Sequence, residues 1–230
     1  MGGYSQFCPV AKAAEVLCQR WTPLIVRELL LGSCRFGEIQ RGVPVMSPTL
    51  LSQRLRELIR AGVVTRTAGG GYELTGAGRE LFGIILAMGE WGQRWARSDY
   101  RGEELDAGLL LWDMRRYLRP GGLGTARQVI EFDFPAQPAK RRHYWLVSDP
   151  SGVDVCLVDP GFQVDVVIRA DLQALTKIWM GDSTYAAELA DGRIEFLGPP
   201  RLIRRIPDWL GQHPALAQVK SARPAAAIVG

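Results

Sequence analysis

The sequence holds few of the side chains that metal sites and catalytic triads use. Of its 230 residues only 2 are His and 4 are Cys. His143 and His213 stand in no pattern typical of a triad or a metal site. The glycine runs lack the lysine of a phosphate-binding loop, and the cysteines lack zinc-site spacing. These absences argue against an enzyme, a bound metal or a cofactor.

Long apolar runs are also missing. No stretch approaches the roughly 18 apolar residues of a membrane span, and the first residues do not resemble a signal peptide. Cysteines without a pairing pattern are typical of a reducing compartment. We therefore expect a cytoplasmic protein with no membrane span.

Charge is divided unevenly along the chain. Residues 1–97 hold twelve Lys and Arg against seven Asp and Glu, whereas residues 98–230 hold sixteen against seventeen. The basic excess favours an anionic partner for the first half, although a basic solvated surface would look the same. The length predicts more than one domain. We place the domains at residues 1–100 and 101–214, followed by a disordered tail at 215–230.

Residues 47–62 have the features of a DNA-reading helix. Ser47 is suited to cap it, Pro48 to its first position and Gly62 to a left-handed stop. One face is apolar at helical spacing: Leu51, Leu55, Leu58 and Ile59. The opposite face offers amides, hydroxyls and guanidiniums, the groups that bind base edges and phosphates. The predicted DNA contacts of this helix are Ser47, Thr49, Ser52, Gln53, Arg56 and Arg60.

The surroundings of this helix separate it from an ordinary solvated amphipathic helix. The pattern predicts a helix at 22–31 and a short helix at 35–41 before it. Two β-prone runs at 63–67 and 72–74 follow it, around a glycine-rich turn, and predict a hairpin. Arg66 beside this turn is either a further DNA contact or a solvated charge.

These segments resemble the HxlR-type winged helix-turn-helix transcription regulators, relatives of the MarR proteins. The match runs from Cys8 to about Arg97. Its most specific pieces are Cys8-Pro-Val, Arg20-Trp-Thr, Ile25-Val-Arg-Glu-Leu-Leu, Arg35-Phe-Gly-Glu-Ile, the run from Ser47 to Leu58, and Tyr72-Glu-Leu-Thr with Gly78. The resemblance implies that a homodimer binds a pseudo-palindromic double-stranded DNA operator.

A helix predicted at 81–97 is more apolar than a surface helix needs to be. Its apolar residues recur at spacings of three and four: Leu81, Ile84, Ile85, Met88, Trp91 and Trp95. Together with a first helix at 10–17, it is the candidate dimer seam, as in the resembled family. Packing against its own domain is the competing explanation.

Cys8 precedes Pro9, which is suited to the first position of a helix. A thiol at a helix N-terminus is a candidate for a lowered pKa and for reactivity. Some relatives in the resembled family sense oxidants with a cysteine at this place. An inert capping or packing residue is the alternative, because the sequence assigns no basic neighbour and no resolving cysteine.

The second half predicts an α+β domain. A helix at 105–117 is followed by strands at 130–134, 144–147, 153–158 and 164–168, the last two joined through Asp159-Pro-Gly. An antiparallel sheet is the natural interpretation. Asp171 is suited to cap a helix that reaches 180, and a short helix at 184–189, a strand at 193–197 and a helix at 199–210 complete the domain.

This order resembles the sterol carrier protein fold over residues 105–212. The resemblance is carried by Trp179-Met-Gly-Asp, by the run 192–198 and by a last helix ending at Trp209-Leu210. It implies an apolar cavity for a hydrophobic small molecule. The candidate ligand-binding residues are Trp112, Phe132, Trp145, Phe162, Trp179 and Tyr185. Each is also a candidate for the ordinary aromatic core of such a domain.

The sequence therefore predicts a dimeric regulator whose winged helix binds DNA and whose C-terminal domain senses a hydrophobic molecule. Three alternatives stay open. In the first, the winged helix is a dimerisation scaffold of a lipid-binding carrier. In the second, the C-terminal domain only dimerises or recruits a partner. In the third, Cys8 makes the protein a thiol redox sensor.

Overall fold

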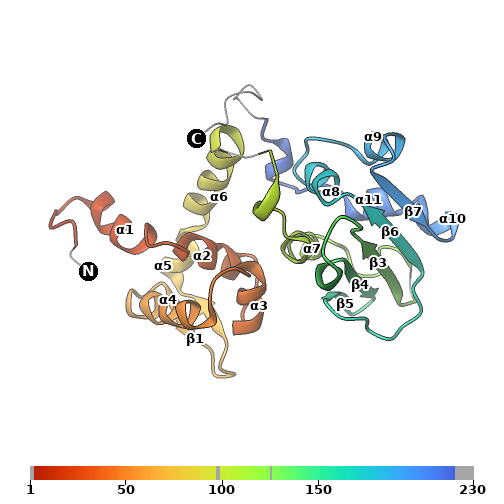
Figure 1. Cartoon of the computed structure of the whole chain (residues 1–230). Helices are drawn as coiled ribbons and strands as arrows, with labels where there is room; N and C mark the ends of the chain where they lie inside the picture. Colours follow the sequence, from red (N-terminus) through yellow and green to blue (C-terminus); the bar gives the residue numbers. More distant parts are fainter. Residues whose placement is uncertain (1–2, 97–98, 125, 221–230) are drawn as a thin grey trace. The chain divides into compact units, whose positions relative to one another are not determined.

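A computed structural model describes residues 3–96, 99–124 and 126–220. The chain forms two compact units, residues 1–89 and 90–230, which we call unit 1 and unit 2. Figure 1 shows the helices of unit 1 and the sheet of unit 2. The predicted α+β class, with a winged helix-turn-helix first and a sheet with helices after it, is confirmed.

Unit 1 is built from helices around one apolar core. They are α1 (Pro9–Leu17), α2 (Thr22–Leu30), α3 (Phe36–Gly42), α4 (Pro48–Arg60), α5 (Gly76–Glu80) and α6 (Phe82–Trp91), which crosses the boundary between the units. Residues from α2, α3, α4 and the hairpin fill the core, among them Ile25, Ile39, Leu55 and Val64. The bounds of α1, α2 and α3 agree within a residue or two with the helices predicted at 10–17, 22–31 and 35–41.

The predicted hairpin consists of β1 (Val64–Arg66) and β2 (Tyr72–Leu74), which pair antiparallel with Val64 opposite Leu74. Gly70 in the turn has φ +77°, a left-handed conformation that glycine adopts without steric cost. The helix predicted at 81–97 is less regular than expected. It starts at Phe82 and widens into a π-helical turn, η1 (Gly92–Ala96). Residue 97 lies outside the described residues.

Unit 2 contains a five-stranded sheet with the order β5-β4-β3-β6-β7. The strands are β3 (Gln128–Asp133), β4 (His143–Asp149), β5 (Gly152–Cys156), β6 (Val166–Ala170) and β7 (Ile194–Leu197). The prediction of an antiparallel sheet was wrong for one pair, because β3 and β6 run parallel with Ile130 opposite Val166. Segment 157–165 does not close a hairpin. It is long enough to cross three strand spacings, about 14 Å, and carry β6 to the far side of β3.

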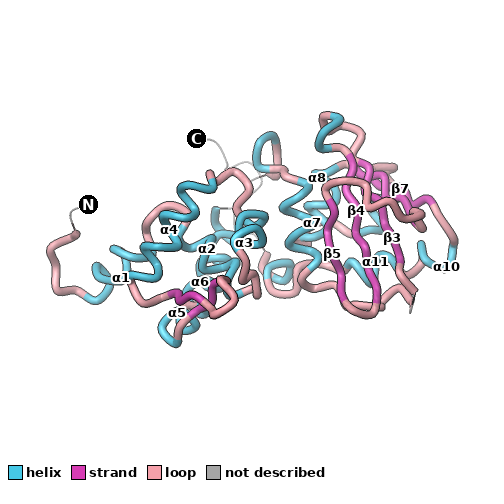
Figure 2. Tube along the Cα trace, turned by 90° about the horizontal axis from the view of Figure 1, so that it is seen from below, coloured by secondary structure: helices cyan, strands magenta, loops and turns pink. Residues whose placement is uncertain are grey.

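Helices lie on one side of this sheet. They include α7 (Ala107–Arg115), α8 (Leu172–Trp179) and α11 (Ile206–Leu210). Figure 2 shows α7 next to β5 and α11 behind the strands. α9 (Tyr185–Ala190) and α10 (Pro200–Ile203) complete the set, with the short turns η2 (Gly102–Glu104), η3 (Ala139–Arg141) and η4 (Leu216–Gln218). The single helix predicted at 199–210 is two helices, with Pro207 in the first turn of the second. Proline lacks the N–H that would continue the first helix.

The inward face of the sheet carries the apolar half of each alternating strand. Ile130 and Phe132 of β3 stand opposite Leu146 and Tyr144 of β4, and all four belong to the core. Of the predicted tail, residues 215–220 include η4, whereas 221–230 lie outside the described residues. No helix in the described part of the chain is both long and apolar enough to span a membrane.

Candidate nucleic-acid interface

α4 is held at both ends by the residues that the sequence indicated. The Leu50 N–H donates to Ser47 Oγ at 3.3 Å, Pro48 occupies the first turn, and Gly62 has φ +71° after the helix ends. Leu51, Leu55 and Leu58 are buried. Full burial of a leucine side chain stabilises a fold by about 2 kcal/mol, so these three residues fix which face of α4 points outward.

The outward face of α4 collects the predicted DNA contacts. Thr49, Gln53, Arg56 and Arg60 are exposed, Ser47 is exposed at the helix start, and Ser52 is half-buried. Arg56 Nη1 donates to Ser52 Oγ at 3.2 Å, which holds the arginine along the helix. The arrangement places hydroxyls and an amide near the helix start and two guanidiniums further along. These are groups that contact phosphates and base edges.

Arg54 and Glu57, on the flank of this face, were not predicted from the sequence. Gln53 Nε2 donates to Glu57 Oε1 at 2.9 Å, and Arg54 forms an ion pair with the same carboxylate. The hydrogen bond from Gln53, and then Arg54, hold the pKa of Glu57 below its usual value. The sequence spacing could have predicted both contacts, because residues three and four apart are neighbours on a helix. Arg54 is three residues before Glu57, and Gln53 is four residues before it.

The turn that leads into α4 is braced by a side chain of α3. Gln40 Nε2 donates to the carbonyl oxygen of Met46 at 2.7 Å and to that of Val43 at 3.2 Å. These bonds satisfy two backbone carbonyls in the connection between the helices. They fix the point from which Ser47 starts α4.

A buried carboxylate joins α2 to α3 beneath this turn. Glu28 is fully buried, accepts a hydrogen bond from Arg27 Nη2 at 2.8 Å and another from Ser33 Oγ at 3.2 Å. Arg27 Nη2 also donates to the carbonyl oxygen of Gly42 at 3.1 Å. Gly42 gives the carboxylate its space, because a Cβ there would lie 1.8 Å from Glu28 Cδ. Burial of Glu28 was not predicted, because its partners Ser33 and Gly42 lie outside α2.

Arg66 lies folded against the hairpin. Its Nη2 donates to Tyr72 Oη at 3.0 Å, its Nη1 to the carbonyl oxygen of Gly70 at 3.3 Å, and its guanidinium lies 4.7 Å from the centre of the Tyr72 ring. Tyr72 N–H donates to the carbonyl oxygen of Cys34 at 2.7 Å. The hairpin is thereby tied to the segment before α3. Arg66 shapes the turn and still presents an exposed side chain beside it.

Cys8 occupies the N-cap position of α1, with Pro9 in the first turn. It is half-buried, and its carbonyl oxygen accepts a hydrogen bond from Lys12 N–H at 3.1 Å. Cys18 stands at the other end of the same helix. The 9 residues of α1 lie between the two cysteines. Their Cα atoms are about 15 Å apart along the helix, too far for a disulfide between them.

The six aromatic candidates of unit 2 do not share one space. Phe132, Trp179, Tyr185 and Trp112 are buried, and the first three belong to the core. Trp145 is half-buried on the opposite face of the sheet, where it stands opposite Glu131. Phe162 is exposed, with the guanidinium of Arg127 4.2 Å from the centre of its ring.

Unit 2 also holds a charged cluster at the end of β3. Asp133 is buried and accepts hydrogen bonds from Arg142 Nε at 2.6 Å and Arg169 Nε at 3.2 Å. The bond from Arg142 keeps the pKa of this carboxyl below its usual value. A pocket of about 400 Å³ lies beside Arg169. Across the described residues, no group of three or more His, Cys, Asp or Glu is placed to hold a metal ion.

The family model that matches this chain is that of the HxlR-like helix-turn-helix, over residues 16–100. An uncharacterized HTH-type transcriptional regulator of Bacillus subtilis, YvaP, is 40% identical over 98 residues, which are 40% of this chain and 91% of that protein. This chain belongs to the HxlR-like helix-turn-helix family. The residues that cap and surround α4 lie within the HxlR-like segment.

Other relatives are matched over less of their length. An uncharacterized HTH-type transcriptional regulator of Mycobacterium bovis is 39% identical over 92 residues, which are 37% of this chain and 58% of that protein. The chain thus spans little more than half of the first such relatives. Among solved structures, quinone-bound YodB from B. subtilis is 34% identical over 37% of this chain and 97% of YodB, with a TM-score of 0.35. The HxlR-like match ends at residue 100, so the identity of unit 2 does not follow from it.

Proposed function

We propose that this protein is a sequence-specific DNA-binding transcription regulator. One observation carries the proposal: α4 buries three leucines and presents Thr49, Gln53, Arg56 and Arg60 on one exposed face. Family membership supports the same function, because the curated relatives are HTH-type transcriptional regulators. The partner is an operator in double-stranded DNA, and no catalytic role or cofactor is part of the proposal.

The test is fluorescence anisotropy with the DNA upstream of the protein's own gene, across a salt series. Wild type is compared with the Gln53→Ala, Arg56→Ala double variant and with Arg201→Ala, which removes one positive charge from α10 of unit 2. We expect selective binding whose affinity falls steeply with salt. The double variant should lose selectivity and part of the salt dependence, whereas Arg201→Ala should keep both. Equal binding of operator and random DNA by wild type would refute the proposal.

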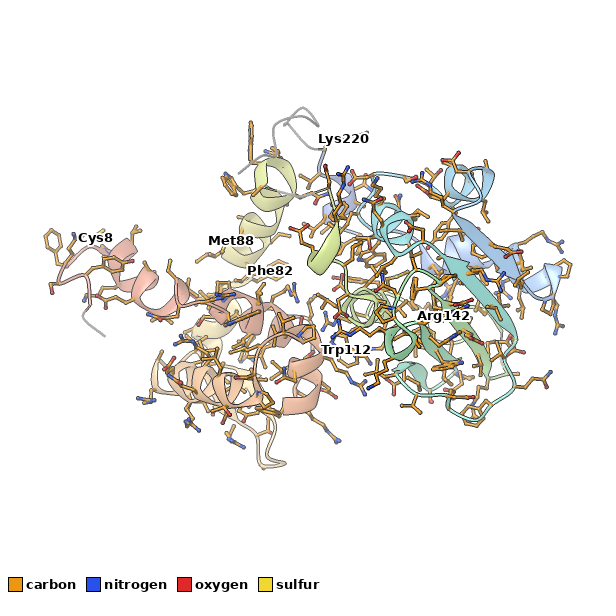
Figure 3. All side chains as sticks on the ribbon, in the orientation of Figure 1. Cys8, Phe82, Met88, Trp112, Arg142 and Lys220 are labelled. Carbon is orange, nitrogen blue, oxygen red and sulfur yellow. The ribbon has the colours of Figure 1, made fainter. Side chains whose placement is uncertain are left out.

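The DNA-binding form is proposed to be a homodimer whose seam includes α6 and α1. None of the α6 residues is buried, and Phe82, Ile84 and Met88 expose 59%, 46% and 51% of their surface. Figure 3 labels Phe82 and Met88 on α6. Val10 of α1 is 75% exposed. Apolar surface of this extent is typical of an interface, and a dimer would place two reading helices one helical turn of DNA apart, about 34 Å.

Sedimentation velocity tests the dimer directly. Ile84→Glu with Met88→Glu places two charges on the apolar face of α6 and should give monomers that no longer bind operator tightly. Val158→Glu is the control, because Val158 is a solvent-exposed apolar residue, 76% exposed, in unit 2. A wild-type protein that is monomeric at micromolar concentration, free and on DNA, would contradict this part of the proposal.

For unit 2 we propose a sterol-carrier-like domain that binds a hydrophobic small molecule. Its support is a sheet whose inward face is apolar and packs against apolar residues of the helices. Phe132, Trp179 and Tyr185 line that inward layer, whereas Trp112, Trp145 and Phe162 are placed elsewhere and are weaker candidates. A ligand would regulate DNA binding only if it favours one arrangement of the dimer over another.

Native mass spectrometry of the purified full chain tests for such a ligand. Co-purifying lipid that is lost from Trp179→Leu, while the variant keeps its thermal stability, would support the sensor. Bound lipid together with no selective DNA binding would favour the lipid carrier. If no hydrophobic ligand is retained or bound, unit 2 is better explained as a dimerisation or recruitment domain.

Thiol control through Cys8 is the second candidate mode of regulation. The observation that favours it is the position of a half-buried thiol at the N-cap of α1, within the proposed seam. Peroxide should then weaken operator binding by wild type and leave Cys8→Ser unaffected. Cys18 is too distant within the chain to be the disulfide partner of Cys8. Unchanged affinity after peroxide treatment would remove this mode.

A further inference from the structure

Glu57 lies at the edge of the reading face of α4, where the side chains of Arg54 and Gln53 both reach it. We infer that Glu57 is a positioning residue for base recognition, which fixes the amide of Gln53 in the orientation that selects adenine. The inference rests on the proposed DNA binding. It deepens that proposal by naming the base that one position of the helix reads.

The geometry leaves one edge of the Gln53 amide free. One N–H of Gln53 Nε2 is donated to Glu57 Oε1 at 2.9 Å. With the N–H anti to Oε1 donated to Glu57, the second N–H and Oε1 form the remaining edge, with one donor beside one acceptor. Gln53 is exposed, so this edge is open to solvent in the free protein. The amide is thereby oriented before any DNA arrives.

A donor beside an acceptor is the complement of adenine in the major groove. Adenine presents N7 as an acceptor and the N6 amino group as a donor, and a glutamine amide contacts both. Guanine presents two acceptors, N7 and O6. To meet guanine the amide would have to turn its NH₂ end toward the base, which removes the hydrogen bond to Glu57. Glu57 therefore penalises guanine at the pair that Gln53 contacts.

Arg54 explains how a carboxylate can be placed beside DNA. It forms an ion pair with Glu57 Oε2, whereas Gln53 donates to Oε1, and the Arg54 side chain is only 12% exposed. Glu57 is itself 28% exposed and is held ionised by hydrogen bonds from both neighbours. The positive charge of Arg54 offsets the repulsion between Glu57 and the phosphates. The carboxylate can thus keep its orienting role at the DNA surface.

The experiment is selection of binding sites from a randomised double-stranded DNA pool, followed by sequencing. It compares the full-length wild type with Gln53→Ala, Glu57→Ala and Glu57→Gln. Wild type should select adenine at one position of each half-site, and Gln53→Ala should lose the preference there. Glu57→Ala should accept adenine or guanine at that same position, with discrimination reduced about 10-fold. Glu57→Gln, which retains an acceptor for Gln53, should restore the preference for adenine.

Two controls separate orientation from general effects. Glu80→Ala removes an exposed carboxylate from α5. Any gain in sequence-independent affinity that comes only from lost negative charge should therefore appear in Glu80→Ala as well as in Glu57→Ala. Thermal unfolding of Glu57→Ala should stay within a few degrees of wild type. A double-variant cycle on an adenine site should show that the effects of Gln53→Ala and Glu57→Ala are not additive.

The outcomes distinguish the two levels of the proposal. If wild type selects no sequence at all, the proposed function fails and this inference fails with it. If wild type selects a sequence but Glu57→Ala keeps full preference for adenine, the role of Glu57 is refuted and DNA binding stands. Selection at the Gln53 position of a base other than adenine would also overturn the inference.

Discussion

The Gly42→Ala substitution is the sharpest test of how unit 1 is held together. Alanine is favoured over glycine in a helix by about 1 kcal/mol, so a surface site would gain stability from this change. At Gly42 the new Cβ would lie 1.8 Å from Glu28 Cδ and 2.0 Å from Glu28 Oε2. The carboxylate must therefore leave its place. It is fully buried, so moving it breaks its bonds with Arg27 and Ser33.

Separating a buried charge from its partners costs about 3–5 kcal/mol. Set against the helical gain, the expected net loss is about 2–4 kcal/mol. For a domain of this size that corresponds to a fall in the melting temperature of unit 1 of roughly 10–25 °C. The measurement is thermal unfolding of the full chain by calorimetry, with the transition of unit 2 as an internal reference.

Gly37→Ala is the matched control, because Gly37 lies in the same helix, α3, and no atom comes within 4 Å of its added Cβ. It should leave the melting temperature unchanged or raise it slightly. Equal melting temperatures for the two variants would show that Glu28 has room to move, and the reasoning about its buried network would be wrong.

Three further changes test other parts of the structure. Ser47→Ala removes the cap of α4 and should lower the free energy of unfolding by about 1 kcal/mol, measured by urea denaturation, whereas Ser47→Asn should retain it. Asp133→Asn should destabilise unit 2 at pH 7 by about 2 kcal/mol. Arg142 lowers the folded-state pKa of Asp133 below the ordinary value of 3.8. The difference in free energy of unfolding between wild type and variant should therefore be full above pH 3.8 and shrink as the pH falls below it. A constant difference down to pH 2 would contradict the ion pair. Tyr185→Phe should leave stability equal or higher, because the buried Tyr185 hydroxyl has no hydrogen-bond partner among the described residues; a loss above 1 kcal/mol would reveal a hidden partner.

Helix starts were the features best predicted from the sequence, because a cap is a local bond. The Asp171 side chain accepts a hydrogen bond from Ala174 N–H at 2.8 Å, as its place before an apolar-periodic segment predicted. Ser47 acts in the same way on α4. Both bonds link residues three apart, so no knowledge of the tertiary fold was needed to expect them.

Features that depend on distant pairing were not predictable in this way. The Asp-Pro-Gly sequence at 159–161 is typical of a hairpin turn, yet β6 pairs with β3 rather than with β5. The choice depends on which strand edge is free when the sheet assembles. The burial of Glu28 is of the same kind, since it depends on the absence of a side chain at Gly42 of another helix. Similarly, alternation predicted that Phe132 and Trp145 lie on strands, but only the register shows that they face opposite sides.

The bonds around α4 constrain how the protein can be regulated. Gln40 braces the turn before the helix, the Glu28 network joins α2 to α3, and Cys34 ties the hairpin to α3 through its carbonyl oxygen. Reshaping the reading helix would break several of these bonds at once. In the proposed homodimer, an effector should therefore alter the spacing of two intact α4 helices. Hydrogen exchange at α4 should stay unchanged when an effector abolishes operator binding, and new exchange within α4 would instead show that the helix itself is remodelled.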